Sequence, residues 1–315
     1  MTDHTYRLSV DKYAHRDWRA DRTPAMTVES GATITFECAP GTGDAIDPST
    51  TAAEAEAAPF PGHMLTGPVE IETAQPGDVL EVEIQSVETA DWGFTFIPPG
   101  ASDDRGLLSE EFPEPYLYHW DLDKTGKFVD GIEVPLDPFP GTIGVAPAGK
   151  PQSTIPPRTV GGNMDISSLT AGSKLFVPVA VEGGLLSVGD GHAAQGDGEV
   201  CVTALETAIT LTVEVTVHSD YSIETPRFVT PGQDQRDGSG YATVGIAKSL
   251  NTAAKRAIKA MVEDLVEHQG LTQQQAYVLC SVAVDLQINE VVNQPNVVVS
   301  ALLPECVVES THLCP

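Results

Sequence analysis

The feature that most constrains this fold is the alternation of apolar and polar residues along short segments of the first two-thirds of the chain. Residues 32–37 and 79–84 alternate in this way, and residues 209–217 place an apolar side chain at every second position. Successive side chains of a β-strand point to opposite faces, so this period predicts strands. Turn sequences such as Pro76-Gly77-Asp78 separate the segments, and short strands divided by Pro and Gly are typical of a sandwich or a barrel.

The last quarter of the chain changes to the period of a helix. One helical face collects Ala254, Ile258, Met261, Val262 and Leu265. Gly270 is placed to end that helix, and Thr272 with Gln275 has the spacing of a capping box that begins a second one. In the second helix, four residues are expected to face the protein interior, namely Ala276, Leu279, Ala283 and Leu286. Residues 293–295 should then break the chain before a final strand at 296–303, which predicts β-rich layers followed by a small α+β segment.

Two composition-biased segments interrupt the strand patterns. Residues 43–62 are rich in Ala, Asp and Glu and predict a long surface loop. Residues 98–140 combine Pro, aromatic and acidic residues and predict an excursion over the surface. The chain contains no internal repeat at a period of about 20–50 residues.

The chain is strongly acidic, with 45 acidic and 17 basic residues and a formal net charge of -28. This charge repels nucleic acid and anionic membranes, so neither is expected as a partner. The acids are spread between well-patterned apolar segments, which favours a folded protein with the carboxylate-rich, lysine-poor surface of halophilic proteins over an ordinary acidic mesophile. In molar salt the Debye length falls to roughly 3 Å, which screens the self-repulsion.

Two further features of the sequence bear on the cellular compartment of the protein. The N-terminus is polar, and no apolar run approaches the ~18 residues that a membrane span needs. The five cysteines are an odd number without CxxC spacing. They predict reduced, mostly buried thiols and a cytoplasmic protein. Cys201 lies in the strand-like run 200–204, where a small buried thiol is the default interpretation.

The most informative segment is residues 186–199, in which four glycines alternate with potential ligands. The potential ligands are Asp190, His192, Gln195, Asp197 and Glu199. Carboxylate oxygen and imidazole nitrogen suit Zn²⁺ or a related divalent ion, which can polarise an amide carbonyl. On spacing alone, a structural Ca²⁺ loop or a plain glycine-rich hairpin loop remains an alternative.

Three other places offer candidate site residues. In the Gly161-Gly162 turn segment, Asn163 and Asp165 lie two residues apart and so point to the same side of an extended chain; the alternative is a turn in which both bond their own backbone. His63 is a candidate ligand, although a lone histidine in a loop is more often solvated. Glu37 is a fourth candidate, although it occupies the polar face of its strand.

Several of these segments carry a resemblance to a known family. Residues 187–199 and the following Ala204-Leu205-Glu206 resemble the central block of the acetamidase/formamidase family. Residues 161–165, 66–69 with 75–78, and 141–147 resemble further blocks of that family in the expected order. The resemblance also includes the C-terminal helix and residues 292–295, so it covers nearly the whole chain.

This resemblance implies a fold and an activity. The implied fold is mainly β, with a β-sandwich core of jelly-roll type, a second β-rich part and a small C-terminal α+β segment. We expect these intimately packed parts at residues 1–150, 151–225 and 226–315, the second carrying the metal-site loop. The implied activity is hydrolysis of formamide, acetamide or similar short linear amides to carboxylate and ammonia. The alternative from another class is a non-catalytic β-sandwich module that binds carbohydrate or calcium.

The resemblance also implies a set of site residues. Asp165, Asp190 and His192 are expected to bind a divalent metal, with zinc preferred and calcium as the alternative. Glu199 is expected to move protons during catalysis. Four more residues are expected to bind substrate or support the site, namely Asn163, Glu37, His63 and Gln195. The expected partners are a small amide and further copies of the chain, as a homodimer or a larger homo-oligomer.

Overall fold

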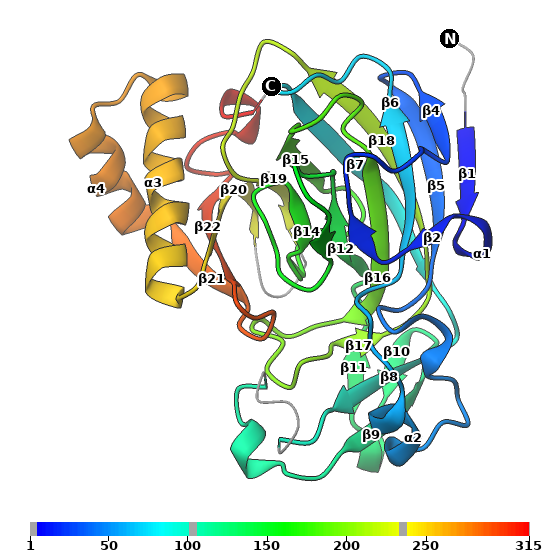
Figure 1. Ribbon diagram of the computed structural model, residues 1–315. Helices are drawn as coiled ribbons and strands as arrows, with labels where there is room; N and C mark the ends of the chain where they lie inside the picture. Colours follow the sequence, from blue (N-terminus) through cyan, green and yellow to red (C-terminus); the bar gives the residue numbers. More distant parts are fainter. Residues whose placement is uncertain (1–4, 101–105, 233–237, 315) are drawn as a thin grey trace.

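The computed structural model describes residues 5–100, 106–232 and 238–314, and it is mainly β. In these residues, strands form two nine-stranded sheets and two isolated pairs. Figure 1 shows a sandwich, two helices along one side of it, and a smaller lobe below. The mainly β sandwich expected from the sequence is confirmed, and the three expected parts all contribute strands to one sheet.

The first sheet crosses the whole sandwich. In spatial order it contains β1 (Thr5–Ser9), β5 (Ala32–Cys38), β18 (Ile209–His218), β7 (Val79–Thr89), β15 (Lys174–Pro178), β19 (Arg227–Gly232), β20 (Gly238–Ala247), β22 (Val297–Pro304) and β21 (Asp285–Glu290). The three alternating segments of the sequence are β5, β7 and β18, and the final expected strand is β22, so these predictions are confirmed.

The second sheet continues from the sandwich into the lower lobe. Its order is β14 (Gly161–Asn163), β12 (Phe139–Gly144), β16 (Leu186–Ala194), β17 (Leu205–Glu206), β8 (Trp92–Ile97) and β9 (Tyr116–Asp121). β6 (Leu65–Ile71) pairs with β16, and β2 (Ala14–His15) and β4 (Met26–Val28) pair with β6. The isolated pairs are β10 (Thr125–Lys127) with β11 (Glu133–Pro135) and β3 (Asp17–Trp18) with β13 (Gln152–Ser153).

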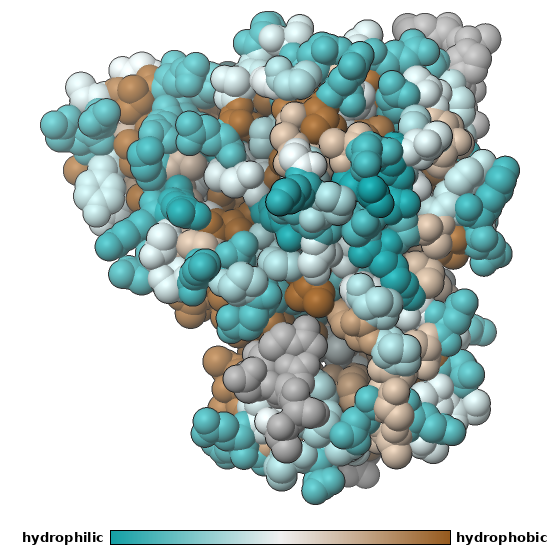
Figure 2. All heavy atoms as spheres, viewed as in Figure 1, coloured by the Kyte–Doolittle hydropathy of each residue, from teal (hydrophilic) through white to brown (hydrophobic). Residues whose placement is uncertain are grey.

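The main core lies between the two sheets. The apolar faces of β5, β7 and β18, including the fully buried Phe36, Ile84 and Val213, pack in one cluster with Val69 and Val188 of the second sheet. Alternation in these strands therefore buries one face and leaves the other polar. The face of the molecule in Figure 2 is correspondingly mainly hydrophilic.

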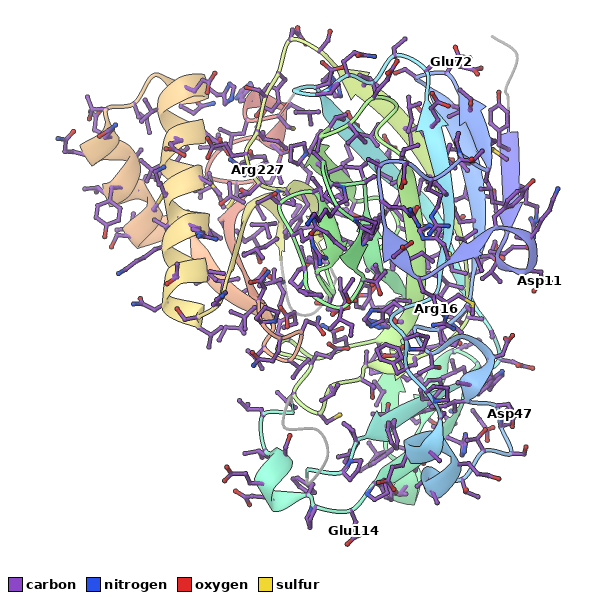
Figure 3. The ribbon with its side chains drawn as sticks, viewed as in Figure 1. Asp11, Arg16, Asp47, Glu72, Glu114 and Arg227 are labelled. Atoms are coloured by element: carbon purple, nitrogen blue, oxygen red, sulfur yellow. The ribbon has the colours of Figure 1, made fainter. Side chains whose placement is uncertain are left out.

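Two helices cover the far end of the first sheet. They are α3 (Leu250–Gln269) and α4 (Gln273–Ala283). Gly270 ends α3 in the left-handed conformation, and the Thr272 capping box is present, as the sequence predicts. Arg227 of β19 bonds the Asp264 carboxylate of α3 at 2.7 Å, and the two are buried between the helix and the sheet (Figure 3).

Four sequence predictions need correction. The segment 43–62 contains a 3₁₀ turn, η1 (Gly43–Ala45), and a helix, α2 (Ala52–Ala57), because Thr51 and Glu54 form a capping box. Leu286 lies in β21 and is 51% exposed, because α4 ends at Ala283. Residues 200–202 form a turn instead of a strand.

The fourth correction concerns residues 98–140, of which residues 101–105 lie outside the described part. This segment carries strands β9–β11 and the 3₁₀ turns η2 (Ser109–Glu111) and η3 (Val129–Gly131), and it ends in β12, which is fully buried between β14 and β16. The remaining short helices are α1 (Val10–Tyr13) and η4 (Ser310–His312). No helix among the described residues is long and apolar enough to cross a membrane.

Candidate active site

Polar side chains gather where β16 leaves the sandwich for the lower lobe. His192 of β16 is in register with Phe139 of β12 on one side and with Glu206 of β17 on the other. Asp190 lies two residues earlier on the same strand, so both residues of the Asp-x-His motif reach this place together. A register shift after His192 ends the regular pairing with β17, as bulges beside functional sites often do.

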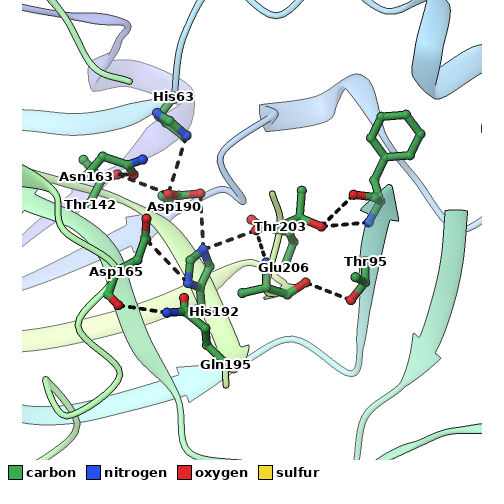
Figure 4. A network of polar contacts seen from close by, with 12 residues as sticks. His63, Thr95, Thr142, Asn163, Asp165, Asp190, His192, Gln195, Thr203 and Glu206 are labelled. Carbon is green, nitrogen blue, oxygen red and sulfur yellow. Dashed lines mark hydrogen bonds and ion pairs between the residues drawn. The ribbon is translucent and has the colours of Figure 1, made fainter. Parts of the chain in front are cut away.

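The His192 ring lies among three carboxylates (Figure 4). Its Nε2 atom is 3.2 Å from Glu206 Oε1 and 3.6 Å from Asp190 Oδ1, and its Nδ1 atom is 3.9 Å from Asp165 Oδ1. Glu199 completes the cluster, because ligand atoms of His192, Glu199 and Glu206 all lie within 4.8 Å of one another. These five residues, here called the carboxylate–imidazole cluster, are each at most 6% exposed.

The Asp165 carboxylate is fixed by contacts from distant parts of the chain. Asn293 Nδ2 donates to Asp165 Oδ2 at 2.5 Å, and Gln195 Nε2 donates to the Asp165 carbonyl at 2.8 Å. The Gly161-Gly162 turn before it has φ angles of 90° and 101°, which glycine adopts without strain. Asp165, in the loop after β14, therefore meets His192 of β16.

The Asp190 carboxylate has a second set of neighbours. The Thr142 hydroxyl lies 3.1 Å from Asp190 Oδ2 and 2.5 Å from Asn163 Oδ1, and it donates to one of them at a time because it has one proton. His63 Nε2 lies 3.8 Å from Asp190 Oδ2. Asn163 and His63 thus stand beside the cluster, and both line the cavity that opens onto it.

Two glycines keep room around these groups. A Cβ atom on Gly141 would come within 2.5 Å of His192 Cε1 and 2.6 Å of Asp165 Oδ1. A Cβ atom on Gly41 would come within 2.2 Å of Asp190 Oδ1. The backbone therefore approaches the cluster more closely than any other residue type allows, which makes the cluster a close-fitting cradle.

Burial and mutual repulsion shift the pKa values of the cluster. Burial raises the pKa of Asp165 to about 7, and burial together with the Asp165 charge raises the pKa of Glu199 well above its usual range. Burial also raises the pKa of Glu206. Burial alone would raise the pKa of Asp190 too, but the neighbouring His63 and His192 outweigh it and lower the pKa. Burial likewise opposes the charged form of His192, but Glu206 and Asp190 outweigh it and raise its pKa.

The donor set of the cluster fits a divalent cation. Asp165 Oδ1 and His192 Nδ1 are buried without a hydrogen-bond partner among the described residues, and a buried polar atom without a partner is costly. The cluster brings four carboxylates to one imidazole, and oxygen and imidazole nitrogen are the ligands that zinc accepts. Two overlapping groups, Asp165 with Asp190 and His192, and His192 with Glu199 and Glu206, have the spacing to hold a metal ion.

The structure brings together most of the residues singled out from the sequence. Asp165, Asp190, His192 and Glu199 form the cluster, with Asn163, His63 and Gln195 beside it. Glu37 lies elsewhere, because its side chain is paired with Arg7 at 2.5 Å on the surface of the sandwich. His63 differs from the solvated loop histidine that its sequence context favours, since its side chain is only 12% exposed.

Sequence reasoning did not assign a role to Glu206, Thr142 or Asn293. Glu206 stood within the Ala204–Glu206 block, but its approach to His192 depends on the pairing of β17 with β16. Asn293 follows Glu290, whose Oε2 atom accepts the backbone N–H of Asn293 at 2.9 Å. The Asn293 contact with Asp165 spans 128 positions and those of Thr142 with Asn163 and Asp190 span 21 and 48, so no local spacing predicts them.

The chain has clear relatives. A model of the acetamidase/formamidase family matches residues 2–152 and 148–310. A formamidase of Methylophilus methylotrophus is 27% identical over 365 residues and covers 93% of this chain and 89% of that protein. A Schizosaccharomyces pombe protein provisionally named a formamidase is 31% identical over 280 residues, which cover 69% of this chain and 68% of that protein.

Solved structures agree with these relatives. An acetamidase of Bacillus halodurans is 30% identical and superposes with a TM-score of 0.88, covering 96% of this chain and 99% of that chain. These proteins are named as amide hydrolases, and nothing in the comparisons supports the alternative of a non-catalytic binding module.

Proposed function

Because this chain belongs to the acetamidase/formamidase family, and so is a hydrolase of linear amides, we propose that the carboxylate–imidazole cluster is its metal-dependent active site. The observation that carries the proposal is the buried His192 ring with three carboxylate oxygens within 3.9 Å of its nitrogens. A cavity of about 260 Å³ opens onto this cluster. The proposed reaction converts a short primary amide and water into a carboxylic acid and ammonia, which ionise in solution to carboxylate and ammonium.

Asp165, Asp190 and His192 are the proposed metal ligands, and Glu206 lies close enough to His192 to join them. Zinc is the preferred ion because the set contains imidazole, whereas calcium favours oxygen ligands alone. A divalent cation held by these residues would supply a Lewis acid that polarises the amide carbonyl. Gln195 supports the site by holding the Asp165 carbonyl.

Glu199 is the proposed proton carrier. The attacking water loses a proton as its oxygen bonds to the amide carbon, and the nitrogen must gain a proton before the C–N bond breaks, because neutral ammonia leaves and an amide anion does not. A carboxylate whose pKa is raised by burial, as for Glu199, suits both transfers in sequence. Asn163 and His63 line the cavity beside the cluster, and we assign them to binding the amide group.

Ammonia release from formamide and acetamide tests this function. We expect release by the wild-type protein, loss after treatment with a chelator, and recovery on adding Zn²⁺. Replacing His192 with alanine should remove a ligand, so metal content per chain after dialysis should fall well below that of the wild type. Full metal and full activity in His192→Ala would show that the cluster is structural and that the active site lies elsewhere.

Two further properties are proposed on separate grounds. A reducing compartment, the cytoplasm, suits the five cysteines, because all of them are free thiols. A homo-oligomer suits the exposed apolar residues of α4 and the edge strand β21, which are Tyr277, Val278, Val282, Leu286 and Ile288. Light scattering at physiological concentration measures the oligomeric state, and a monomer would contradict this second property.

A further inference from the structure

The cavity is larger than a formamide or acetamide molecule requires. Its volume is about 260 Å³. Acetamide has four heavy atoms and displaces roughly three water molecules, or about 100 Å³ of liquid water. An acetamide bound at the cluster would therefore leave more than half of the cavity to water or to another part of the substrate.

The lining of the cavity is divided by chemistry. The floor consists of the carboxylates of the cluster together with Asn163, His63 and Asn293. The outer wall is mainly apolar, with Ile46, Ala55, Ala58, Phe60, Phe96 and Pro98, and Glu56 of α2 is the charged residue beside them. A substrate that fills the cavity is consequently polar at one end and apolar at the other.

The outer wall is built into the fold. Ile46 and Ala55 are 4% and 7% exposed and pack against Phe94 of β8, so the segment around α2 is fixed to the second sheet. Arg16 connects the two ends of this segment, because its guanidinium donates to the carbonyls of Thr42 and Gly62 at 3.3 and 2.5 Å. A wall held in this way is preorganised to bind an apolar group.

The floor determines which end of the amide faces inward. Its carboxylate oxygens accept hydrogen bonds, and the NH₂ group of a primary amide offers two donors. Nitrogen must also lie near Glu199 to receive its proton. With the amide group placed so, the acyl chain extends toward the wall, which begins at Phe60, whose ring meets the His63 ring edge-on at 5.1 Å.

We propose, on the basis of the amide hydrolysis proposed above, that this enzyme prefers primary amides whose acyl group is larger and more apolar than acetyl, with the α2 wall as the specificity determinant. Each methylene group that leaves water for the wall should strengthen binding of the transition state. The expected gain in kcat/KM is about threefold to fourfold per methylene, and so about tenfold from acetamide to butyramide.

The first arm of the test measures kcat/KM by ammonia release for acetamide, propionamide, butyramide and valeramide with the metal-loaded enzyme. A rise along the series supports the proposal. A flat or falling series with clear acetamide activity overturns the role of the wall and leaves amide hydrolysis standing. Absence of hydrolysis for every amide would overturn both proposals.

The second arm uses two tryptophan variants at neighbouring positions. Ala58 lines the cavity, whereas Ala57 of α2 is exposed and lies outside the lining. Ala58→Trp should lower the butyramide-to-acetamide ratio of kcat/KM about tenfold, because the indole ring fills the outer cavity. Ala57→Trp should keep the wild-type ratio. Equal ratios in the two variants and the wild type would overturn the assignment of the wall.

Discussion

Replacing Gly141 with alanine adds one methyl group to the most tightly enclosed part of the cluster. The backbone angles of Gly141 lie outside the left-handed region, so alanine is not strained by its own conformation. The added Cβ atom would lie 2.5 Å from His192 Cε1 and 2.6 Å from Asp165 Oδ1. The substitution therefore tests the close fit of the cluster by adding one methyl group, without changing any charge.

The geometry sets the size of the expected effect. Non-bonded contacts settle near 3.5 Å, so the methyl group forces a displacement of roughly 1 Å. His192 has little room to retreat, because it is 1% exposed and packs edge-on against Phe139, and any shift of Asp165 would break its hydrogen bond with Asn293. A misplacement of about 1 Å costs on the order of 100-fold in rate, and overpacking of this kind costs about 1–3 kcal/mol of folding free energy.

The assay combines three measurements on purified Gly141→Ala. These are kcat/KM for acetamide, metal content after dialysis, and melting temperature, with Gly196→Ala as the matched control. Gly196 also has an ordinary φ angle, and no heavy atom lies within 4 Å of the position its Cβ would occupy, so the control should stay close to wild type. Wild-type metal content together with activity within about fivefold of wild type would show that His192 and Asp165 can move away from the added methyl group. That result would refute the close fit of the cluster.

Three further predictions address the proton carrier, pH and salt. Glu199→Gln keeps the shape of the side chain and removes its basicity, so activity should fall about 10²–10⁴-fold with metal retained; loss of metal would make Glu199 a ligand. Burial lowers the pKa of His15 to about 4, below its unfolded value of about 6.5, so His15 by itself lowers the free energy of unfolding by up to about 3 kcal/mol as pH falls from 6.5 to 4; urea titrations should show the free energy of unfolding of the wild type falling by that amount relative to His15→Gln over this range, and a constant difference between the two would contradict it. The melting temperature should be lower below ~0.5 M KCl than at ~2 M, because salt screens carboxylate repulsion; an unchanged value would contradict adaptation to high salt.

Local periodicity accounts for the parts of the fold that the sequence predicts well. The strands β5, β7 and β18 each bury one face in the main core, so apolar and polar residues alternate along their sequences. The capping residues of α4 are three positions apart and bond one another directly. The same capping signal at Thr51 and Glu54 predicts α2, but the acid-rich composition around it favours a loop, and capping proves the stronger determinant.

Long-range register explains why the candidate site is only partly predictable from the sequence. Asp190 and His192 are two residues apart on one strand, which places both on the same face. Glu206 reaches His192 through strand pairing, and Asn293 reaches Asp165 across 128 positions of sequence. Such contacts depend on how whole elements pack, so a single sequence contains the residues of the site but not their mutual positions.

Three of the five non-glycine residues with a positive φ angle among the described residues carry buried carboxylates, and the other two are Leu185 and Val202. Asp165, Asp190 and Glu199 have positive φ angles of 47°, 60° and 48°, a conformation that costs a non-glycine residue of order 1 kcal/mol or more. Burying several carboxylates together adds a further cost, which the raised pKa values of Asp165 and Glu199 express. Both costs lower the free energy of unfolding, and hydrophobic burial in the core between the two sheets offsets them. A bound cation offsets the second cost, since it replaces mutual repulsion of the carboxylates with attraction to a shared positive charge. The concentration of both costs at one place, beside a cavity of substrate size, is therefore what a site retained for catalysis would show and what a merely structural loop would avoid.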